Sequence, residues 1–431
     1  MNDTERHVAR ATAKRQAQAG FSLAELVVSL FVVVLLLVVI LTLFDTTSKL
    51  ARAQTYVADV QQSVRVAQDE MVRYTRIAAR GGLTRGTLPN DMVSVEVRNN
   101  VVDGSPEQQV AKGSADSPLA MRDTDILTVR GVFDHLYFLN SDPGGAAVTF
   151  DDPDNPTRGT LIVQNPIPST GVPQSLQALM KYKDPPNNSR PEAILIASPL
   201  GGTLYHVVEL DPGTSDFSNP SRLVLAFKIT GGTHNADYNS VSANLAFPPE
   251  LRSVAYIGVL EEYRYYIRKI VDPANPTAVT SRLTQTRFYP GSETLYYDND
   301  KDRTVDIADD VVDLQVALAI DKNGDGSIAA ETGDATDEWL WNSDAAAEDD
   351  DPDQWNGAGK RLFYVRINTL ARTARRDPNA ISLPITKIED HAYNELPYND
   401  PTMQDPNNHV APVDRQYRRR LLQTVVDLRN L

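Results

Sequence analysis

The chain has 431 residues, enough for two or three domains of ordinary size, and 41% of them are hydrophobic, enough for a sizeable core. Its formal net charge of −15 argues against a duplex-binding surface, so no nucleic-acid partner is expected. The sequence contains no cysteine, which excludes disulfides, cysteine-ligated zinc and thiol nucleophiles.

The N-terminal region combines a basic segment with a membrane-length apolar run. Residues 1–20 carry more basic than acidic side chains, which favours a cytoplasmic position for this segment. From Phe21 to Phe44 the chain is almost wholly apolar, and as a helix this run would span about 36 Å, enough for a bilayer core. The run is longer than the apolar core of a signal peptide, and no small-residue cleavage site closes it. A plain signal anchor is the simplest interpretation.

One carboxylate, Glu25, interrupts this run and argues against a plain anchor. An acid inside a membrane helix costs about 2.5–3.5 kcal/mol on insertion scales and generally has a partner. Cleavage between Gly20 and Phe21 would create an amino terminus four residues before Glu25, on the same helical face. The terminal ammonium of a neighbouring subunit would then neutralise the Glu25 carboxylate in an apolar environment.

The stretch GFSLAELVVSL resembles the cleavage and methylation motif of type IV pilins and the related pseudopilins. The residues that match the motif are Gly20, Phe21, Ser22, Leu23, Glu25 and Leu26. The resemblance implies that a prepilin peptidase removes residues 1–20 as a leader and methylates Phe21. It also implies that Glu25 takes part in subunit assembly.

A helical pattern continues past Phe44 to about Arg80. Apolar residues recur at steps of mostly three or four, at Leu50, Val57, Val60, Val64, Ala67, Met71, Tyr74 and Ala78. Gly81 and Gly82 are a plausible stop. We therefore expect one helix over residues 21–80, with 21–44 in the membrane and the later stripe packed on a globular domain. A coiled-coil stalk is the alternative, although sustained heptads are missing.

From Leu83 onward the pattern changes to short β-prone runs separated by Pro, Gly, Asn and Asp, which predicts an antiparallel β domain. The predicted strands are 92–97, 125–133, 159–164, 192–198, 203–210, 222–229, 261–270, 311–320, 361–371 and 420–429. Packing of the helix stripe on these sheets would give an α+β fold, a long pilin-type helix on a large β-sheet head. We expect two β-rich subdomains, over residues 83–250 and 251–431.

The C-terminal third carries a second resemblance. The segments VVDLQVALAIDKNGDG, KRLFYVRINTLARTAR and YRRRLLQTVVDLRNL, with the Tyr-rich YRYYIRKI before SRLTQTRFYPG, resemble PilW-type minor pilins. The resemblance covers residues 20–80 and about 255–431, whereas 83–250 carry no recognised pattern. It implies a minor pilin that primes pilus assembly at the tip. The implied partners are other minor and major pilins and a large tip protein of the adhesin type.

Two acidic segments have the spacing of calcium ligands. In DKNGDGSIAAETGD, the side chains of Asp321, Asn323 and Asp325 and the carbonyl of Ser327 match the first half of an EF-hand-like loop. The twelfth position is Thr332 rather than Glu, so another segment must supply the last ligand, and the acidic run at 348–353 is a candidate. An ordinary hairpin turn is the alternative, because D-G and N-G pairs are common turn signals.

The second acidic segment, DNDKDRTVDIADD, places Asp298, Asp300 and Asp302 at similar spacing. Arg303 stands where such a loop needs glycine, so a solvated acidic loop is the alternative interpretation. Ca²⁺ is therefore a candidate ligand, and no other cofactor is predicted.

The sequence lacks the common motifs of zinc sites, serine hydrolases and phosphate-binding loops. The histidines lack zinc-binding spacing, and there is neither a G-x-S-x-G elbow nor a phosphate-binding loop, so we expect no enzyme. A basic cluster of Arg415, Arg418, Arg419 and Arg420 would either bind an acidic partner or protect an edge strand from aggregation.

Together these features predict a minor pilin, held in the inner membrane by one helix with its head in the periplasm and later carried to the extracellular pilus tip. Two alternatives remain. One is a minor pseudopilin of a type II secretion system. The other is a membrane-anchored periplasmic enzyme or calcium-binding protein that keeps its leader.

Overall fold

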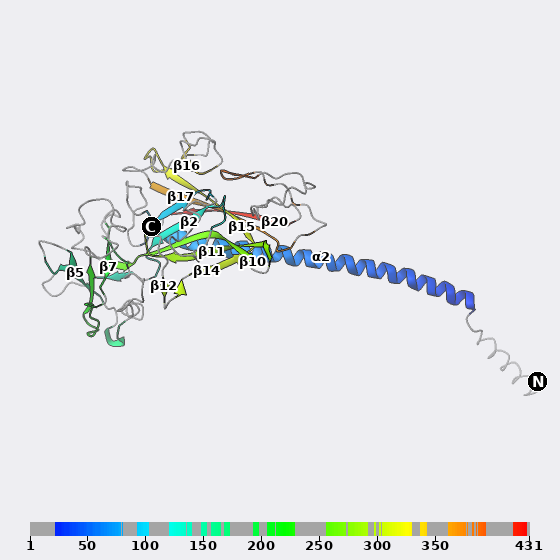
Figure 1. Cartoon of the computed structure of the whole chain (residues 1–431), viewed down its shortest axis with the longest axis horizontal. Coiled ribbons are helices and arrows are strands. Elements are labelled where there is room, and N and C mark those ends of the chain that lie inside the picture. Colours follow the sequence, from blue (N-terminus) through cyan, green and yellow to red (C-terminus); the bar gives the residue numbers. More distant parts are fainter. Residues whose placement is uncertain are drawn as a thin grey trace, which may run out of the picture. The chain divides into compact units, whose positions relative to one another are not determined.

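The computed structural model contains one long helix and several antiparallel sheets (Figure 1). It describes residues 22–78, 80, 93–102, 120–134, 136–139, 148–152, 157–164, 168–172, 193–197, 205–211, 213–228, 256–272, 275–291, 297–298, 301–302, 304–329, 337–342, 361–375, 377, 382, 385, 387–393 and 417–428. The chain divides into two units, Met1–Ala58 and Asp59–Leu431. The α+β fold class predicted from the sequence is confirmed.

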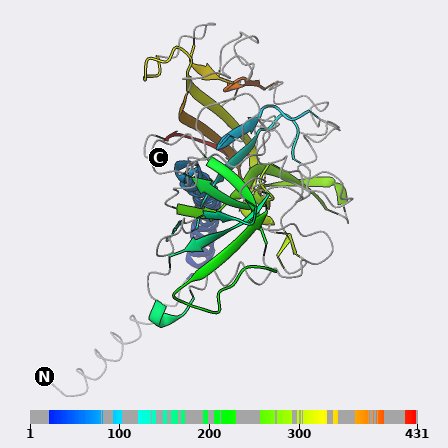
Figure 2. The same ribbon diagram turned by 90° about the vertical axis from the view of Figure 1, so that its left-hand side faces the viewer.

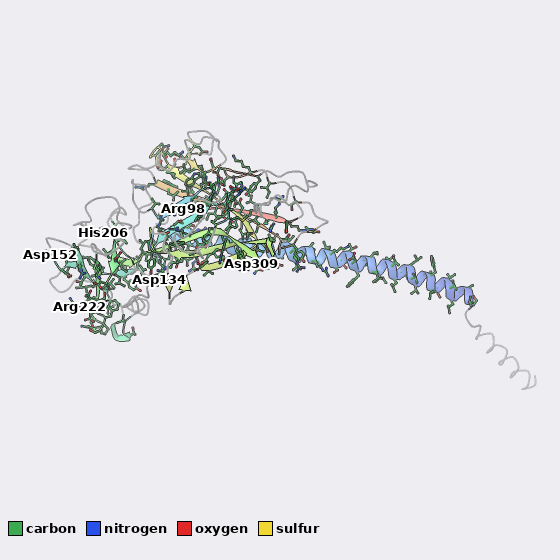
Figure 3. All side chains as sticks on the ribbon, in the orientation of Figure 1. Arg98, Asp134, Asp152, His206, Arg222 and Asp309 are labelled. Atoms are coloured by element: carbon green, nitrogen blue, oxygen red, sulfur yellow. The ribbon has the colours of Figure 1, made fainter. Side chains whose placement is uncertain are left out.

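Helix α2 (Leu23–Ile77) contributes to both units. In the first unit, every residue from Ser22 to Thr47 is exposed, and the side chains project from all sides of the helix (Figure 3). A helix that is apolar all round needs an apolar environment on every side. The predicted helix over 21–80 therefore corresponds to α2, which is slightly shorter at its C-terminal end.

In the second unit, the last turns of α2 pack on β-sheets. The buried residues of this segment recur at helical spacing, at Val60, Val64, Ala67, Gln68, Met71 and Thr75. Tyr74 adds a half-buried aromatic contact, with its ring centroid 5.0 Å from that of Phe133 and 4.9 Å from that of Tyr263. The predicted apolar stripe is thus confirmed from Val60 onward, whereas Leu50 is exposed.

A five-stranded antiparallel sheet has the order β1-β2-β10-β11-β14. Its strands are β1 (Val95–Arg98), β2 (Ile126–Gly131), β10 (Glu261–Asp272), β11 (Asn275–Phe288) and β14 (Thr304–Asp309). Strands from both predicted subdomains pair here, because Gly131 of β2 lies opposite Glu261 of β10. The sheets therefore do not follow the predicted division at residue 250.

A four-stranded antiparallel sheet has the order β16-β15-β17-β20. Its strands are β15 (Val311–Asp321), β16 (Trp339–Leu340), β17 (Arg361–Arg372) and β20 (Arg419–Asp427). Asp310, at a φ of +57°, joins β14 of the first sheet directly to β15 of the second. Side chains from both sheets and from α2 form one hydrophobic core, which includes Met71, Val129, Leu283, Val316 and Ile367.

A seven-stranded antiparallel sheet lies between β2 and β10 in the sequence, and Figure 2 shows its green strands side by side. In the order β3-β9-β6-β7-β8-β5-β4, its strands are Tyr137–Phe138, Tyr256–Val259, Ala193–Ala197, Tyr205–Leu210, Leu223–Lys228, Arg158–Val163 and Val148–Phe150. It has its own core, which includes Leu161, Val208, Leu225 and Phe227. Because β2 and β10 are paired neighbours, this sheet is an insertion between two adjacent strands of the five-stranded sheet.

Every predicted strand has a counterpart in the structure, and several strands were missed. The longest of these is β11, whose polar and β-branched residues gave a weak pattern. Two small hairpins, β12–β13 (Tyr297–Asp298, Lys301–Asp302) and β18–β19 (Lys387–Ile388, His391–Ala392), and the 3-10 helix Pro168–Thr170 complete the described elements. The predicted stop at Gly81 and Gly82 lies outside the described residues.

Candidate functional site

The start of α2 is closed by a reciprocal capping arrangement. The Ser22 backbone N–H donates to Oε2 of Glu25 at 2.9 Å, and the Glu25 N–H donates to Oγ of Ser22 at 3.2 Å. This is a capping box, which satisfies two of the otherwise free N–H groups at a helix start. The S-x-x-E spacing of these residues is the sequence signal of a capping box, which was not among the predictions. Glu25 thus has a local role beside the one predicted for it in assembly.

Helix α2 is long and apolar enough to cross a membrane. Glu25 is the acidic residue of its first turn, and the capping bond occupies one of the two Glu25 carboxylate oxygens. Among the described residues, no cationic group pairs with the Glu25 carboxylate. The predicted processing residues Gly20 and Phe21 lie outside the described part of the chain, so cleavage there remains a prediction.

Gln68 joins α2 to the four-stranded sheet by hydrogen bonds that the apolar pattern did not predict. Its Nε2 donates to the Leu422 carbonyl at 2.6 Å and to the Ile367 carbonyl at 3.1 Å. Its Oε1 accepts a hydrogen bond from the Thr424 hydroxyl. Gln68 is only 2% exposed, so these bonds fix the helix on strands that lie about 300 residues later in the sequence.

The Asp321 loop is ordered by its own hydrogen bonds. Oδ1 of Asp321 accepts the N–H groups of Gly324 at 2.6 Å and Asp325 at 3.2 Å, and Oδ2 accepts the N–H of Gly326 at 2.8 Å. Asp325 in turn accepts the N–H and the hydroxyl of Ser327, at 2.8 and 2.7 Å. Gly324 and Gly326 both have positive φ, which a glycine adopts without strain.

Glu338, the residue directly before β16, closes this loop. Its carboxylate accepts the Lys322 N–H at 3.2 Å and the Ala329 N–H at 2.6 Å, although it lies sixteen residues beyond Lys322. Glu338 is 2% exposed. The acidic run at 348–353, predicted as the donor from outside the loop, lies outside the described residues. Within the described residues, Glu338 is the carboxylate from outside the loop that bonds to it.

The calcium prediction stays a prediction. Among the described residues, no three His, Cys, Asp or Glu side chains are placed to hold a metal ion. The two Asp321 oxygens are occupied by backbone N–H groups, as in a closed turn. In the second segment, Asp298 and Asp302 lie on the β12–β13 hairpin, where Asp298 lies opposite Lys301 in the backbone pairing of the two strands. Asp300 and the side chains of Asp298 and Asp302 lie outside the described part.

A buried acidic cluster on β15 was not predicted. Asp313 is 2% exposed and accepts hydrogen bonds from the Gln315 amide at 3.0 Å and from the Tyr393 hydroxyl. His391 lies 4.0 Å away, and its ring stacks on Tyr393. Burial, together with the negative charges of Asp123 and Asp390, raises the pKa of Asp313 to about 7. These contacts hold the β18–β19 hairpin against the four-stranded sheet.

A second buried charge network centres on Glu262 of β10, which is fully buried. Its carboxylate lies 2.6 Å from Nε of Arg130 and 2.8 Å from Nε of Arg264, and it also accepts the Gly291 N–H at 2.8 Å. The Arg264 guanidinium also lies 4.0 Å from the centre of the Phe288 ring. The Tyr-rich strand seen in the sequence thus contributes charged as well as aromatic core residues.

The remaining site predictions are only partly covered by the structure. Arg418 of the basic cluster pairs with Asp377 at 2.8 Å, Arg419 and Arg420 begin β20, and Arg415 lies outside the described residues.

His206 of β7 is buried in the seven-stranded sheet (labelled in Figure 3), and burial lowers its pKa to about 4, so it is neutral at pH 7.

The described features define the class of fold. A membrane-length apolar helix begins with a capping box at Ser22 and Glu25, and its continuation packs on antiparallel sheets through a buried stripe. This arrangement is consistent with a pilin-like α+β fold.

Comparison with known families makes the assignment more specific. The family described as Type IV Pilus-assembly protein W matches residues 264–430. No curated protein and no solved structure matches the chain. The match spans β11, β14, the four-stranded sheet and most of β10, and it associates this part of the chain with type IV pilus assembly. Neither α2 nor the inserted seven-stranded sheet falls within it.

Proposed function

We propose that this chain is a minor pilin of a type IV pilus, which primes assembly and occupies the pilus tip. The leader of residues 1–20 is removed by prepilin peptidase, and the new terminus at Phe21 is methylated. Before assembly α2 crosses the inner membrane with the head in the periplasm. The activity is association with other minor and major pilins and with a large tip protein, rather than catalysis.

The observation that carries this proposal is the state of the Glu25 carboxylate. One of its oxygens accepts the Ser22 N–H, and both residues lie after the proposed cleavage point, so this cap survives processing. The second oxygen is available for the terminal ammonium of a neighbouring subunit, which balances the charge in an apolar bundle. The match to the Type IV Pilus-assembly protein W family over residues 264–430 supports a pilus over a type II secretion system.

The proposed place at the tip rests on the size of the head. The inserted seven-stranded sheet adds a second hydrophobic core to the one that α2 shares with the other two sheets. A uniform shaft repeats one compact subunit at close spacing, and an enlarged head is tolerated where no further subunit must stack above it.

Mass spectrometry of the chain purified from its native membrane tests the processing step. We expect a product that starts at N-methyl-Phe21, and a product that starts at Met1 would contradict the proposal. Deletion of the gene should then reduce surface pili, whereas loss of protein secretion with normal pili would favour the pseudopilin alternative.

A matched substitution separates the two roles of Glu25. Glutamine at the third position of a capping box still accepts the cap bond, but it carries no charge. We therefore expect Glu25→Gln to retain helix α2 and membrane insertion while losing incorporation into pili. Incorporation at the native level would show that the charge is not needed for assembly.

A further inference from the structure

The β18–β19 hairpin covers the face of the four-stranded sheet that lies away from α2. Gln68 of α2 bonds to the Thr424 side chain of β20, so its neighbour Gln423 faces the other side. Gln423 lies opposite Asn368 of β17, and Asn368 lies opposite Gln315 of β15, so these three residues share that face. The hairpin contacts the amide groups of two of them, at 2.5 Å from Asn368 and 2.9 Å from Gln315.

The turn residues of the hairpin connect the two sheets that share the main core. Glu389 accepts hydrogen bonds from Nε and Nη2 of Arg366 in β17, at 2.7 and 2.6 Å. Asp390 accepts hydrogen bonds from the side-chain amides of Asn99 and Asn100, which follow β1, at 2.6 and 2.9 Å. The docked hairpin therefore links the four-stranded sheet to the edge strand of the five-stranded sheet.

A third attachment of the hairpin is the buried carboxyl group of Asp313 in β15. Asp313 accepts a hydrogen bond from the Tyr393 hydroxyl, and its Oδ2 lies 4.0 Å from Nδ1 of His391. Burial, together with the charges of Asp123 and Asp390, raises the pKa of Asp313 to about 7. The titratable and charged groups that face Asp313 come from the segment before β2 and from the hairpin, and they are Asp123, Asp125, Asp390, His391 and Tyr393.

Ionisation of Asp313 weakens the attachment of the hairpin. The charged form is buried beside carboxylates of the hairpin and of the segment before β2, and Asp390 is the one that belongs to the hairpin. Release of the hairpin removes Asp390 and admits water to Asp313, so the charged form is more stable in the released state. His391 gains positive charge as pH falls, so its titration also favours docking in acid. Ile388 is 5% exposed, and the loss of this burial opposes release.

We propose that the β18–β19 hairpin is a pH-dependent latch, docked on the four-stranded sheet in mild acid and released locally when Asp313 ionises in mild alkali. Release uncovers Arg366 and Asn368, which lie opposite Val425 and Gln423 of β20. Val425 is 49% exposed and Gln423 is also exposed, so release widens a surface that is already accessible. The inference concerns the head alone and does not depend on removal of the leader or on a place in the pilus.

Hydrogen–deuterium exchange of the full-length chain in detergent, with mass spectrometry of peptides that cover residues 387–393, tests this latch. The pKa of Asp313 is about 7 with the hairpin docked, and a solvated aspartate has a pKa of about 3.9. The docking equilibrium should therefore weaken about tenfold between pH 6 and pH 8.5. After correction for the intrinsic pH dependence of exchange, the protection of the hairpin amides should fall by this factor, whereas that of β15 and β17 should not change. An equal fall in all three segments would show unfolding of the head and would overturn a local latch.

Substitutions assign the response to Asp313. Asp313→Asn keeps an acceptor for the Tyr393 hydroxyl but cannot ionise, so hairpin protection should change less than about threefold between pH 6 and pH 8.5. The control Asp309→Asn removes an exposed carboxylate beside Arg282 and should retain the native fall. Asp390→Asn removes the hairpin charge near Asp313, so the midpoint of the fall should move to lower pH. Native hairpin protection that is independent of pH would overturn the proposal, as would the full fall in Asp313→Asn or an unmoved midpoint in Asp390→Asn.

Discussion

Replacement of Gln68 tests whether hydrogen bonds, as well as apolar contacts, hold α2 on the head. In Gln68→Glu, a carboxylate replaces the amide group that donates to the Leu422 and Ile367 carbonyls. The site is 2% exposed, so the new acid is either charged beside two carbonyl oxygens or protonated. Protonation at pH 7 of an acid with an unperturbed pKa of about 4.3 costs about 4 kcal/mol. Gln68→Leu loses the same bonds but adds no charge, and costs about 2 kcal/mol.

The sign of the pH dependence distinguishes the two variants. The pKa of the introduced glutamate in the Gln68→Glu variant is raised in the folded state, so the variant keeps its full stability below about pH 4 and loses stability as pH rises. We expect urea unfolding of the full chain in detergent, followed by tryptophan fluorescence, to show this loss relative to the native chain. Gln62→Glu makes the same chemical change at an exposed position of α2 and should change stability by less than about 0.5 kcal/mol. An equal loss in both glutamate variants, or a loss in Gln68→Glu that is independent of pH, would refute the reasoning.

Three further predictions concern the head. Asp313→Asn should remove about 4 kcal/mol of the pH dependence of unfolding between pH 4 and 8. Burial raises the folded-state pKa of Asp313 to about 7, so the stabilisation from its protonated carboxyl group is lost as pH rises through that value. An unchanged pH profile of the free energy of unfolding would contradict this prediction. Glu262→Ala should cost about 3–5 kcal/mol in urea unfolding, because it removes the fully buried carboxylate that pairs with both Arg264 and Arg130, although Glu96 still pairs with Arg130. Asp309→Ala at the exposed pair with Arg282 should cost less than about 1 kcal/mol. Millimolar Ca²⁺ should raise the Tm of the native chain but not of Asp325→Ala, and equal responses in thermal unfolding would favour the plain turn.

Local periodicity predicted most of the elements of this fold. The step of three or four residues identified the buried stripe of α2 from Val60 onward, and short β-branched runs identified most strands of the three larger sheets. These patterns depend only on which face of an element is buried. The sheet to which each strand belongs depends on pairing across long sequence separations. Strand β2, for example, pairs with β10 across the whole inserted sheet, and nothing in the composition near residue 131 or 261 indicates this.

The residues missed at the candidate sites share the same physical cause. Glu338 reaches the Asp321 loop because Trp339 of β16 pairs with Ala319 of β15, and this register brings the preceding residue beside the loop. Gln68 lies in a mainly apolar stripe, and only the position of β20 supplies the carbonyl of Leu422 and the hydroxyl of Thr424 that it bonds to. The capping box at Ser22 and Glu25 differs, since both partners lie within one helical turn and the S-x-x-E spacing alone is enough to indicate it, although it was not among the predictions. A polar residue is therefore interpretable from sequence when its partner is local. When the partner comes from another strand, the residue can be interpreted only after the strand pairing is known.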